Sequence, residues 1–261
     1  MFYVKLILIM KKFILALQLL TRLHFFNLPF NEVTYGKSSM YFPLVGFLLG
    51  LILVFLYLGL NYVFPPLVVA ALLITGLIFL SGGLHLDGFM DTMDGILSGR
   101  PPERKLEIMR DSRVGAFGVV GLVVLLLLKF TLLFCMPAQV MPRVLILMPA
   151  LSRWGMVYAI ARFSYARPQG IGIYLVKYTK SRELAVAALW GCGVAALNGG
   201  AGLILFIWLT FLTHLLALIF TRHLGGLTGD TYGAINELLE VILLLTVFPL
   251  LKLFPFLNFW W

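Results

Sequence analysis

The chain has 261 residues, of which 61% are hydrophobic and only 12% charged, and it carries a net charge of +9. Its mean hydropathy of +1.01, together with several apolar runs of about 20 residues, places it among membrane proteins rather than soluble domains. Basic cytoplasmic loops account for the positive charge, so we expect no nucleic-acid partner. The length suits a single membrane-embedded domain over residues 1–261.

The N-terminal segment, residues 1–40, begins with an apolar stretch over 3–26 that Lys5, Lys11 and Lys12 interrupt. No small-residue cleavage site follows, so we do not expect a cleavable signal peptide. A helix whose lysines reach toward water can lie in the membrane interface or enter the bilayer partway. We favour an interfacial helix here.

The rest of the chain predicts an all-α, polytopic integral membrane bundle of about six to seven transmembrane helices. A final apolar segment is broken by Pro249 and Pro255, and Cys135 and Cys192 fall in apolar runs, where we expect small buried residues. The predicted spans are 41–64, 66–84, 115–135, 140–162, 183–198 and 200–221, followed by the interrupted segment 235–257.

Basic residues gather in alternate loops. They precede the first span and occupy the loops 85–114, 162–183 and 222–234. The turns at 61–66 and at Asn198 and the C-terminal tail carry none, and one further loop holds only Arg143. By the positive-inside rule, the basic loops face the cytoplasm. The acidic motif in 85–114 and a second motif in 222–237 therefore open on the cytoplasmic side.

Five Asp are present in the whole chain, and Asp87, Asp91 and Asp94 are spaced i, i+4, i+7. On a helix continuing from the second predicted span, this spacing aligns the three carboxylates on one face. Like charges at a membrane boundary repel, and Mg²⁺ relieves this because it takes hard oxygen ligands and leaves room for substrate phosphates. We predict a Mg²⁺ site at these residues. On an ideal helix His85 points away from them.

The segment after this cluster is rich in Arg. Its Pro pair and the pattern of residues 100–109 predict a short amphipathic cytoplasmic helix. Asp111 stands between Arg110 and Arg113, where metal and phosphate could meet because the planar Arg fork suits phosphate. We predict that the catalytic residues are Asp87, Asp91, Asp94 and Asp111.

Two further pieces belong to the same face. Arg153 lies inside a predicted span, so it needs a protein carboxylate or a substrate phosphate as partner. Asp230 stands in a Gly-rich turn that can offer backbone N–H groups to an anion, and the nearby acids suit a second metal or a sugar hydroxyl. The predicted substrate-binding residues are His85, Arg100, Arg110, Arg113, Ser152, Arg153, Asp230, Asn236 and Glu237.

These parts suit phosphoryl transfer, in which metals hold a pyrophosphate and Arg offsets developing charge. An ion or proton carrier is the rival that is not an enzyme, because membrane carboxylates also build such paths. It is weakened by the clustering of the acids at one face.

Five stretches together resemble the cobalamin synthase family, the adenosylcobinamide-GDP ribazoletransferases. The resemblance covers roughly residues 20–245, and one departure is Leu86, where the family often has an acid. The stretches are 82–95 (GGLHLDGFMDTMDG), 106–118 (LEIMRDSRVGAFG), 152–154 (SRW), 165–172 (YARPQGIG) and 225–237 (GGLTGDTYGAINE).

The resemblance implies a late step of coenzyme B12 assembly. Such enzymes join adenosylcobinamide-GDP to α-ribazole, or to its 5′-phosphate, and release GMP with Mg²⁺ as cofactor. It implies that the stretch 87–94 holds Mg²⁺ on the pyrophosphate, that Asp111 completes the metal shell or acts as base, and that Arg110, Arg113 and Arg153 bind phosphates. Asp230 and Glu237 would position the second substrate or another metal. The expected partners are these substrates and the lipid bilayer, and an oligomer is left open.

Two other enzyme families remain as alternatives. Residues 91–95 copy the start of the CDP-alcohol phosphotransferase signature, but its later Asp-containing part does not follow. A prenyltransferase would carry two Asp-rich motifs, whereas the second motif here has only Asp230.

Overall fold

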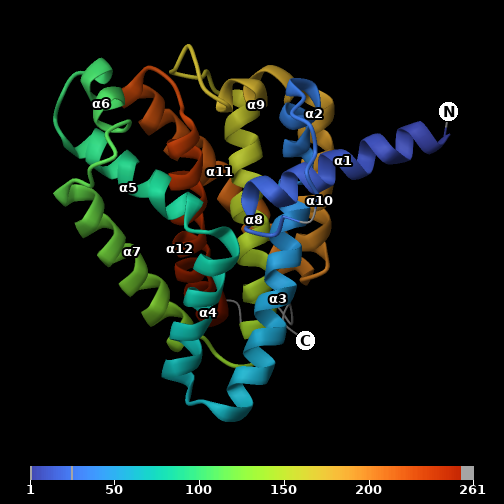
Figure 1. Cartoon of the computed structure of the whole chain (residues 1–261). Helices are drawn as coiled ribbons and strands as arrows, with labels where there is room; N and C mark the ends of the chain where they lie inside the picture. The colour runs from blue at the N-terminus through green and yellow to red at the C-terminus, as the bar shows by residue number, and fades with distance from the viewer. Residues whose placement is uncertain (1, 25, 254–261) are drawn as a thin grey trace.

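The structure, a computed structural model, describes residues 2–24 and 26–253. Across these residues it is helical, apart from an isolated bridge between Tyr165 and Leu227, so the predicted all-α class is confirmed (Figure 1). The end of the last predicted segment, including Pro255, lies outside the described residues.

Five helical segments of the described chain are long and apolar enough to cross a membrane, and a bent pair could form a sixth span. The bent pair is α4 (Pro66–Ser81) with α5 (Leu84–Leu97). The five are Glu32–Val63, which contains α2 (Glu32–Lys37) and α3 (Phe42–Val63), α7 (Ala116–Phe134), α8 (Met141–Arg162), α11 (Gly199–Leu224) and α12 (Gly229–Leu253). The chain is therefore a multi-pass membrane protein.

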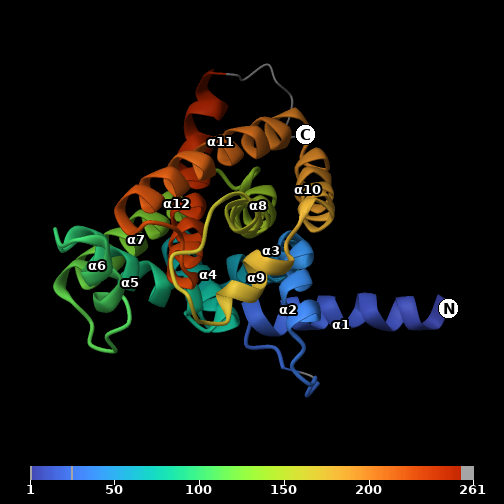
Figure 2. The same ribbon diagram turned by 90° about the horizontal axis from the view of Figure 1, so that it is seen from above.

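Helix α8 forms the centre of the bundle. In the view from above it is surrounded by α3, α10 (Ser181–Ala196), α11 and α12 (Figure 2), and it packs against each of them. In the most apolar stretch of α8, 83% of the residues are buried, whereas in the corresponding stretches of α7 and α11 only 28% are buried. Outer helices with large exposed apolar faces are expected where lipid, not water, is the solvent.

One predicted span forms a helix of the predicted length, but that length is too short to cross a bilayer. Helix α10 (Ser181–Ala196) has 16 residues, fewer than the roughly 20 that a bilayer crossing requires. The prediction of a full span over 183–198 is thus not met by length. Cys135 and Cys192 are exposed on the outer surface rather than buried, because the apolar runs that hold them face outward.

The predicted straight continuation of the second span is wrong. Gly82 and Gly83 both have left-handed backbone angles, with φ of 66° and 71°, and α4 and α5 meet there at 91°. Glycine adopts this conformation without the steric cost of a β-carbon. The Arg22 side chain packs on Gly82, and the Arg22 N–H donates to the Leu80 carbonyl at 2.8 Å. Helix α5 therefore turns away from the direction of α4.

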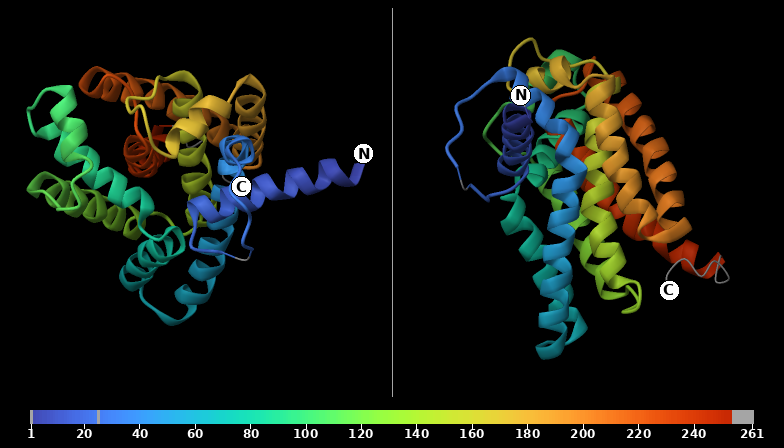
Figure 3. Two further views of the ribbon diagram at one scale, coloured as in Figure 1. Left: turned by 45° about the horizontal axis from the view of Figure 1, so that its top comes forward. Right: turned by 90° about the vertical axis from the view of Figure 1, so that its right-hand side faces the viewer.

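Helix α1 (Phe2–Leu20) runs across the direction of the long helices (Figures 1 and 3). Its Ala16 and Leu20 are buried in the core, so its C-terminal half is anchored to the bundle. This is the orientation expected of an interfacial helix. The predicted amphipathic helix after the acidic motif is also present, as α6 (Pro102–Ile108).

Candidate active site

Helices α5 and α12 cross at unusually short range, through glycines. A β-carbon on Gly88 would lie 2.8 Å from the Asp230 carbonyl oxygen, and one on Gly233 would lie 3.1 Å from the His85 Cα. Only glycine allows backbones to approach so closely. The crossing brings Asp87 and Asp91 near enough to Asp230 for their charges to interact.

Asp230 is held at the start of α12 by two contacts. The Arg167 guanidinium donates to its carboxylate at 2.7 Å, and the Thr228 hydroxyl does so at 3.3 Å. The Thr228 hydroxyl also accepts from the Thr231 N–H at 3.2 Å. This N-terminal cap explains why α12 begins at Gly229, six residues before the predicted start at 235.

Backbone hydrogen bonds join the loop that carries Arg167 to the turn that carries Asp230. The Ala166 N–H donates to the Leu227 carbonyl at 2.8 Å, and the Leu227 N–H donates to the Ser164 carbonyl at 2.8 Å. Two motifs separated by some sixty residues in the chain are therefore one structural unit.

A cavity of about 660 Å³ opens beside this unit. Its charged lining residues are Asp87, Asp230, Arg110 and Arg167, which belong to α5, to α12 and to the loops after α6 and α8, and we call this part the charged end; His85 also lines the cavity. Apolar lining residues come from α1, α3, α8 and α9 (Gly172–Tyr178), and we call this part the apolar end: Leu20, Phe42, Met156, Ile160 and Leu175. A concave site with a few convergent charges and an apolar remainder is typical of a small-molecule site.

The three Asp of α5 do not share one site. Both Asp94 oxygens accept backbone hydrogen bonds at the start of α7, from the Gly115 N–H and the Gly118 N–H, each at 2.8 Å. Asp94 is buried there, and it therefore acts as an N-terminal cap. Within the described chain, no three His, Cys, Asp or Glu side chains converge tightly enough to hold a metal by themselves.

Asp111 lies on the exposed loop after α6. The Arg113 guanidinium donates to it at 2.7 Å, and this hydrogen bond lowers the pKa of the Asp111 carboxyl to about 2. A carboxylate with so low a pKa is a weak proton acceptor near neutral pH. All three Arg predicted here are exposed, and of the three only Arg110 lines the cavity.

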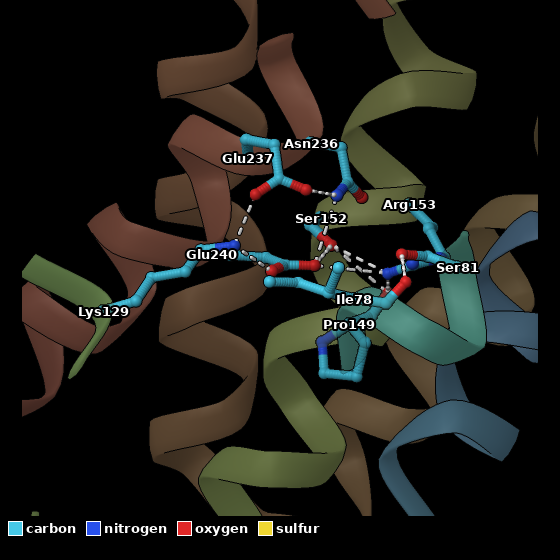
Figure 4. Close-up of polar contacts among 9 residues, drawn as sticks. All are labelled: Ile78, Ser81, Lys129, Pro149, Ser152, Arg153, Asn236, Glu237 and Glu240. Carbon is cyan, nitrogen blue, oxygen red and sulfur yellow. Dashed lines mark hydrogen bonds and ion pairs between the residues drawn. The ribbon is translucent and has the colours of Figure 1, made fainter. Parts of the chain in front are cut away.

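A buried network of ion pairs joins α7, α8 and α12 (Figure 4). The Lys129 ammonium lies 2.5 Å from Glu237 and 2.7 Å from Glu240, and the Arg153 guanidinium lies 3.3 Å from Glu240. Ser152 and Asn236 also donate to Glu240, at 3.4 and 3.2 Å. The anionic partner expected for Arg153 is thus a protein carboxylate.

Four predicted substrate-binding residues belong to this network, namely Ser152, Arg153, Asn236 and Glu237. None of them lines the 660 Å³ cavity, and their charges are compensated within the protein. Their role in substrate binding stays a prediction.

The sequence reasoning missed Lys129 and Arg167, and it grouped Glu240 with the acids near Asp230 without assigning it a basic partner. Lys129 is a lone charge inside an apolar run, and Glu240 follows Glu237 by one helical turn, so both were detectable as charges needing a partner. Arg167 stood in a recognised motif but had no visible link to Asp230, because that link depends on loop pairing.

The fold and the cavity define a multi-pass membrane protein with a charged pocket at one end. The model of the family described as cobalamin-5-phosphate synthase matches residues 12–248. The chain belongs to this family, in agreement with the motif resemblance and not with the CDP-alcohol phosphotransferases or prenyltransferases.

Curated relatives named adenosylcobinamide-GDP ribazoletransferase include proteins from Desulfitobacterium hafniense strain Y51, Desulforamulus reducens and Roseiflexus sp. strain RS-1. They are 43%, 41% and 40% identical to this chain, over 93%, 87% and 84% of its length and 98%, 91% and 82% of theirs. No solved structure matches the chain.

Proposed function

We propose that this protein joins adenosylcobinamide-GDP to α-ribazole, or to its 5′-phosphate, and releases GMP. A ribose hydroxyl oxygen of α-ribazole forms a bond to the phosphorus that carries the cobinamide. The bond from that phosphorus to the bridging pyrophosphate oxygen breaks, GMP departs with the electron pair, and the hydroxyl proton passes to a base or to water. The observation that carries this proposal is the cavity whose charged end combines carboxylates and Arg within a chain of this family.

Mg²⁺ is proposed as the cofactor, held by Asp87, Asp91 and Asp230. These residues fit it because they bring like charges together at the α5–α12 crossing, and because Mg²⁺ needs only one or two carboxylates when substrate phosphates and water supply the rest. The ion would offset charge on the phosphates. The predicted set of Asp87, Asp91 and Asp94 changes in one member, since the Asp94 oxygens already accept two backbone N–H groups.

The Arg at the charged end have a separate task. Arg110 and Arg167 line the cavity and suit the phosphates of the departing nucleotide, since the planar guanidinium binds phosphate through two parallel hydrogen bonds. Arg167 is already fixed by Asp230, so its position is set before substrate binds. We do not assign Asp111 as the base, because its carboxyl is held by Arg113.

The proposed location is the bacterial inner membrane, with the cavity facing the cytoplasm. The loops that form its charged end are the basic ones, 85–114, 162–183 and 222–234, and positive charge marks cytoplasmic loops. This side gives access to cytosolic nucleotides. Cysteine labelling of a Ser112→Cys variant in right-side-out vesicles tests it: labelling by an impermeant reagent only after the vesicles are opened supports the assignment.

The direct test is turnover by the purified protein in detergent or nanodiscs. With Mg²⁺, adenosylcobinamide-GDP and α-ribazole, we expect GMP and an adenosylcobalamin product, and none from a CDP-alcohol pair. Asp91→Ala should lose product formation while the protein stays folded, whereas Glu103→Ala on the exposed face of α6 should retain it. Near-normal turnover by Asp91→Ala would overturn the site assignment.

A further inference from the structure

Two residues that line the cavity each have a buried polar atom that finds no hydrogen-bond partner within the described chain. These atoms are the Tyr232 hydroxyl and the His85 Nε2. Tyr232 is 2% exposed and His85 is 3% exposed, and both residues line the cavity. A buried polar atom without a partner is costly, so such atoms beside a cavity point to a ligand that supplies one.

The Tyr232 side chain has an aromatic neighbour, and several residues that line the same cavity are apolar. The Tyr165 and Tyr232 rings stack with centroids 6.5 Å apart and an interplanar angle of 26°. Phe42, Met156 and Ile160 complete this part of the wall. Such a surface suits a flat aromatic group that carries few polar atoms.

The volume of the cavity indicates which of the two substrates of the proposed reaction can be enclosed in it. At about 660 Å³ it lies within the roughly 300–1,000 Å³ range of sites for drug-sized ligands. A corrin macrocycle with an adenosyl group and a nucleotide is far larger than such a ligand, whereas α-ribazole is of this size. The corrinoid therefore cannot be enclosed here, although its pyrophosphate can reach the charged end.

The hydrogen-bonding groups of the two substrate bases, guanine and dimethylbenzimidazole, indicate which base the apolar end can bind. Guanine presents several donors and acceptors along its edges, and a pocket that encloses it must satisfy them all. The dimethylbenzimidazole of α-ribazole has two methyl groups and one unsubstituted ring nitrogen, which accepts one hydrogen bond. The apolar wall with the Tyr232 hydroxyl matches the second base and not the first.

We propose that the apolar end of the cavity binds the dimethylbenzimidazole base of α-ribazole, with the Tyr232 hydroxyl donating to its free ring nitrogen. The ribose then extends toward Asp87 and Asp230, where its hydroxyl meets the pyrophosphate. This inference rests on the proposed function and adds the position and orientation of one substrate.

The first test is Tyr232→Phe, which removes one hydroxyl and keeps the ring. We expect the KM for α-ribazole to rise roughly tenfold, the effect of one lost hydrogen bond in a buried site, with the KM for adenosylcobinamide-GDP unchanged. Tyr62→Phe, on a side chain that is 93% exposed, is the matched control and should change neither constant. A change only in the KM for adenosylcobinamide-GDP would overturn the proposal.

The second test reduces the space at the apolar end and then offers a smaller substrate. Ile160→Phe places a larger side chain in the wall of the cavity, so α-ribazole should bind poorly. The riboside of unsubstituted benzimidazole, which lacks both methyl groups, should fit the reduced space and recover turnover. An equal loss of turnover with both nucleosides would contradict the proposed position of the base. It is also the result expected if the apolar end binds a lipid chain instead of the base. Failure of the proposed function is distinct, because the unaltered protein would then give no product with either nucleoside.

Discussion

Gly88 of α5 lies directly against the backbone of Asp230 at the start of α12, so that a β-carbon on Gly88 would stand 2.8 Å from the Asp230 carbonyl oxygen. This contact sets the separation of the carboxylates on the two helices. Any side chain at position 88 has to push the helices apart.

Gly88→Ala should therefore lower turnover much more than it lowers stability. Overpacking costs about 1–3 kcal/mol, whereas a shift of about 1 Å in a catalytic group can cost about 100-fold in rate. The measurements are product formation and thermal unfolding in one detergent. Gly59→Ala is the control, since no atom lies within 4 Å of its would-be β-carbon. Equal turnover in the two variants would contradict the crossing as a determinant of the site.

Two substitutions of Arg167 should distinguish the contribution of its positive charge from that of its planar guanidinium group. Arg167→Ala removes the guanidinium that lies 2.7 Å from Asp230, and hydrogen bonds to charged groups contribute about 1.5–3 kcal/mol, so a roughly 10- to 100-fold loss of turnover is expected. Arg167→Lys should fall between Ala and Arg because Lys lacks the planar fork. Arg104→Ala, in an exposed ion pair with Glu107, should leave turnover unchanged. If Lys at position 167 performs no better than Ala, charge is not part of its role.

Removing one carboxylate from the buried network should destabilise the protein strongly. Glu240→Gln leaves Lys129 and Arg153 with a single carboxylate between them, and breaking a buried pair costs about 3–5 kcal/mol. Glu107→Gln, in the exposed pair on α6, should cost at most about 1 kcal/mol. Thermal unfolding compares the two variants directly. Lys129→Met in the Glu240→Gln background should recover part of the loss, because it restores equal numbers of charges.

Asp91 and Asp94 should respond differently to Ala. Asp94→Ala removes a cap from α7 and should cost about 1–2 kcal/mol of stability. Asp91→Ala should leave stability nearly unchanged and lose more turnover than Asp94→Ala. Parallel measurements of unfolding and product formation decide this. Greater loss of turnover in Asp94→Ala would restore Asp94 to the metal site.

Local patterns predicted the helical class and most helix positions, since apolar runs and punctuating Gly and Pro act over a few residues. The predicted spans 41–64, 115–135 and 140–162 agree with α3, α7 and α8 to within about a residue at most ends. The turn at Gly82 and Gly83 was visible as two glycines, but its 91° angle depends on their left-handed backbone, which no apolar pattern encodes.

The candidate site was harder to predict because its contacts are distant in the chain. Helical spacing placed Asp94 beside Asp87 and Asp91, which is correct for a bare helix, but the free N–H groups at the start of α7 provide Asp94 with a nearer partner. Likewise, the pairing of Arg167 with Asp230 requires two loops to meet. Motif resemblance identified the relevant stretches, and only the fold assigned the partners.

The network of Lys129, Arg153, Glu237 and Glu240 also bears on how the chain assembles in its membrane. To this network α7 contributes one cation, α8 one cation and α12 two anions, and a charge at the centre of an isolated transmembrane helix costs about 2.5–3.5 kcal/mol to insert. The sum of these charges is zero only after the three helices have met. The three helices are synthesised at different times, so their stable insertion into the bilayer is coupled to their association with one another. Helix α12 is synthesised last, and its two carboxylates neutralise the cations of α7 and α8.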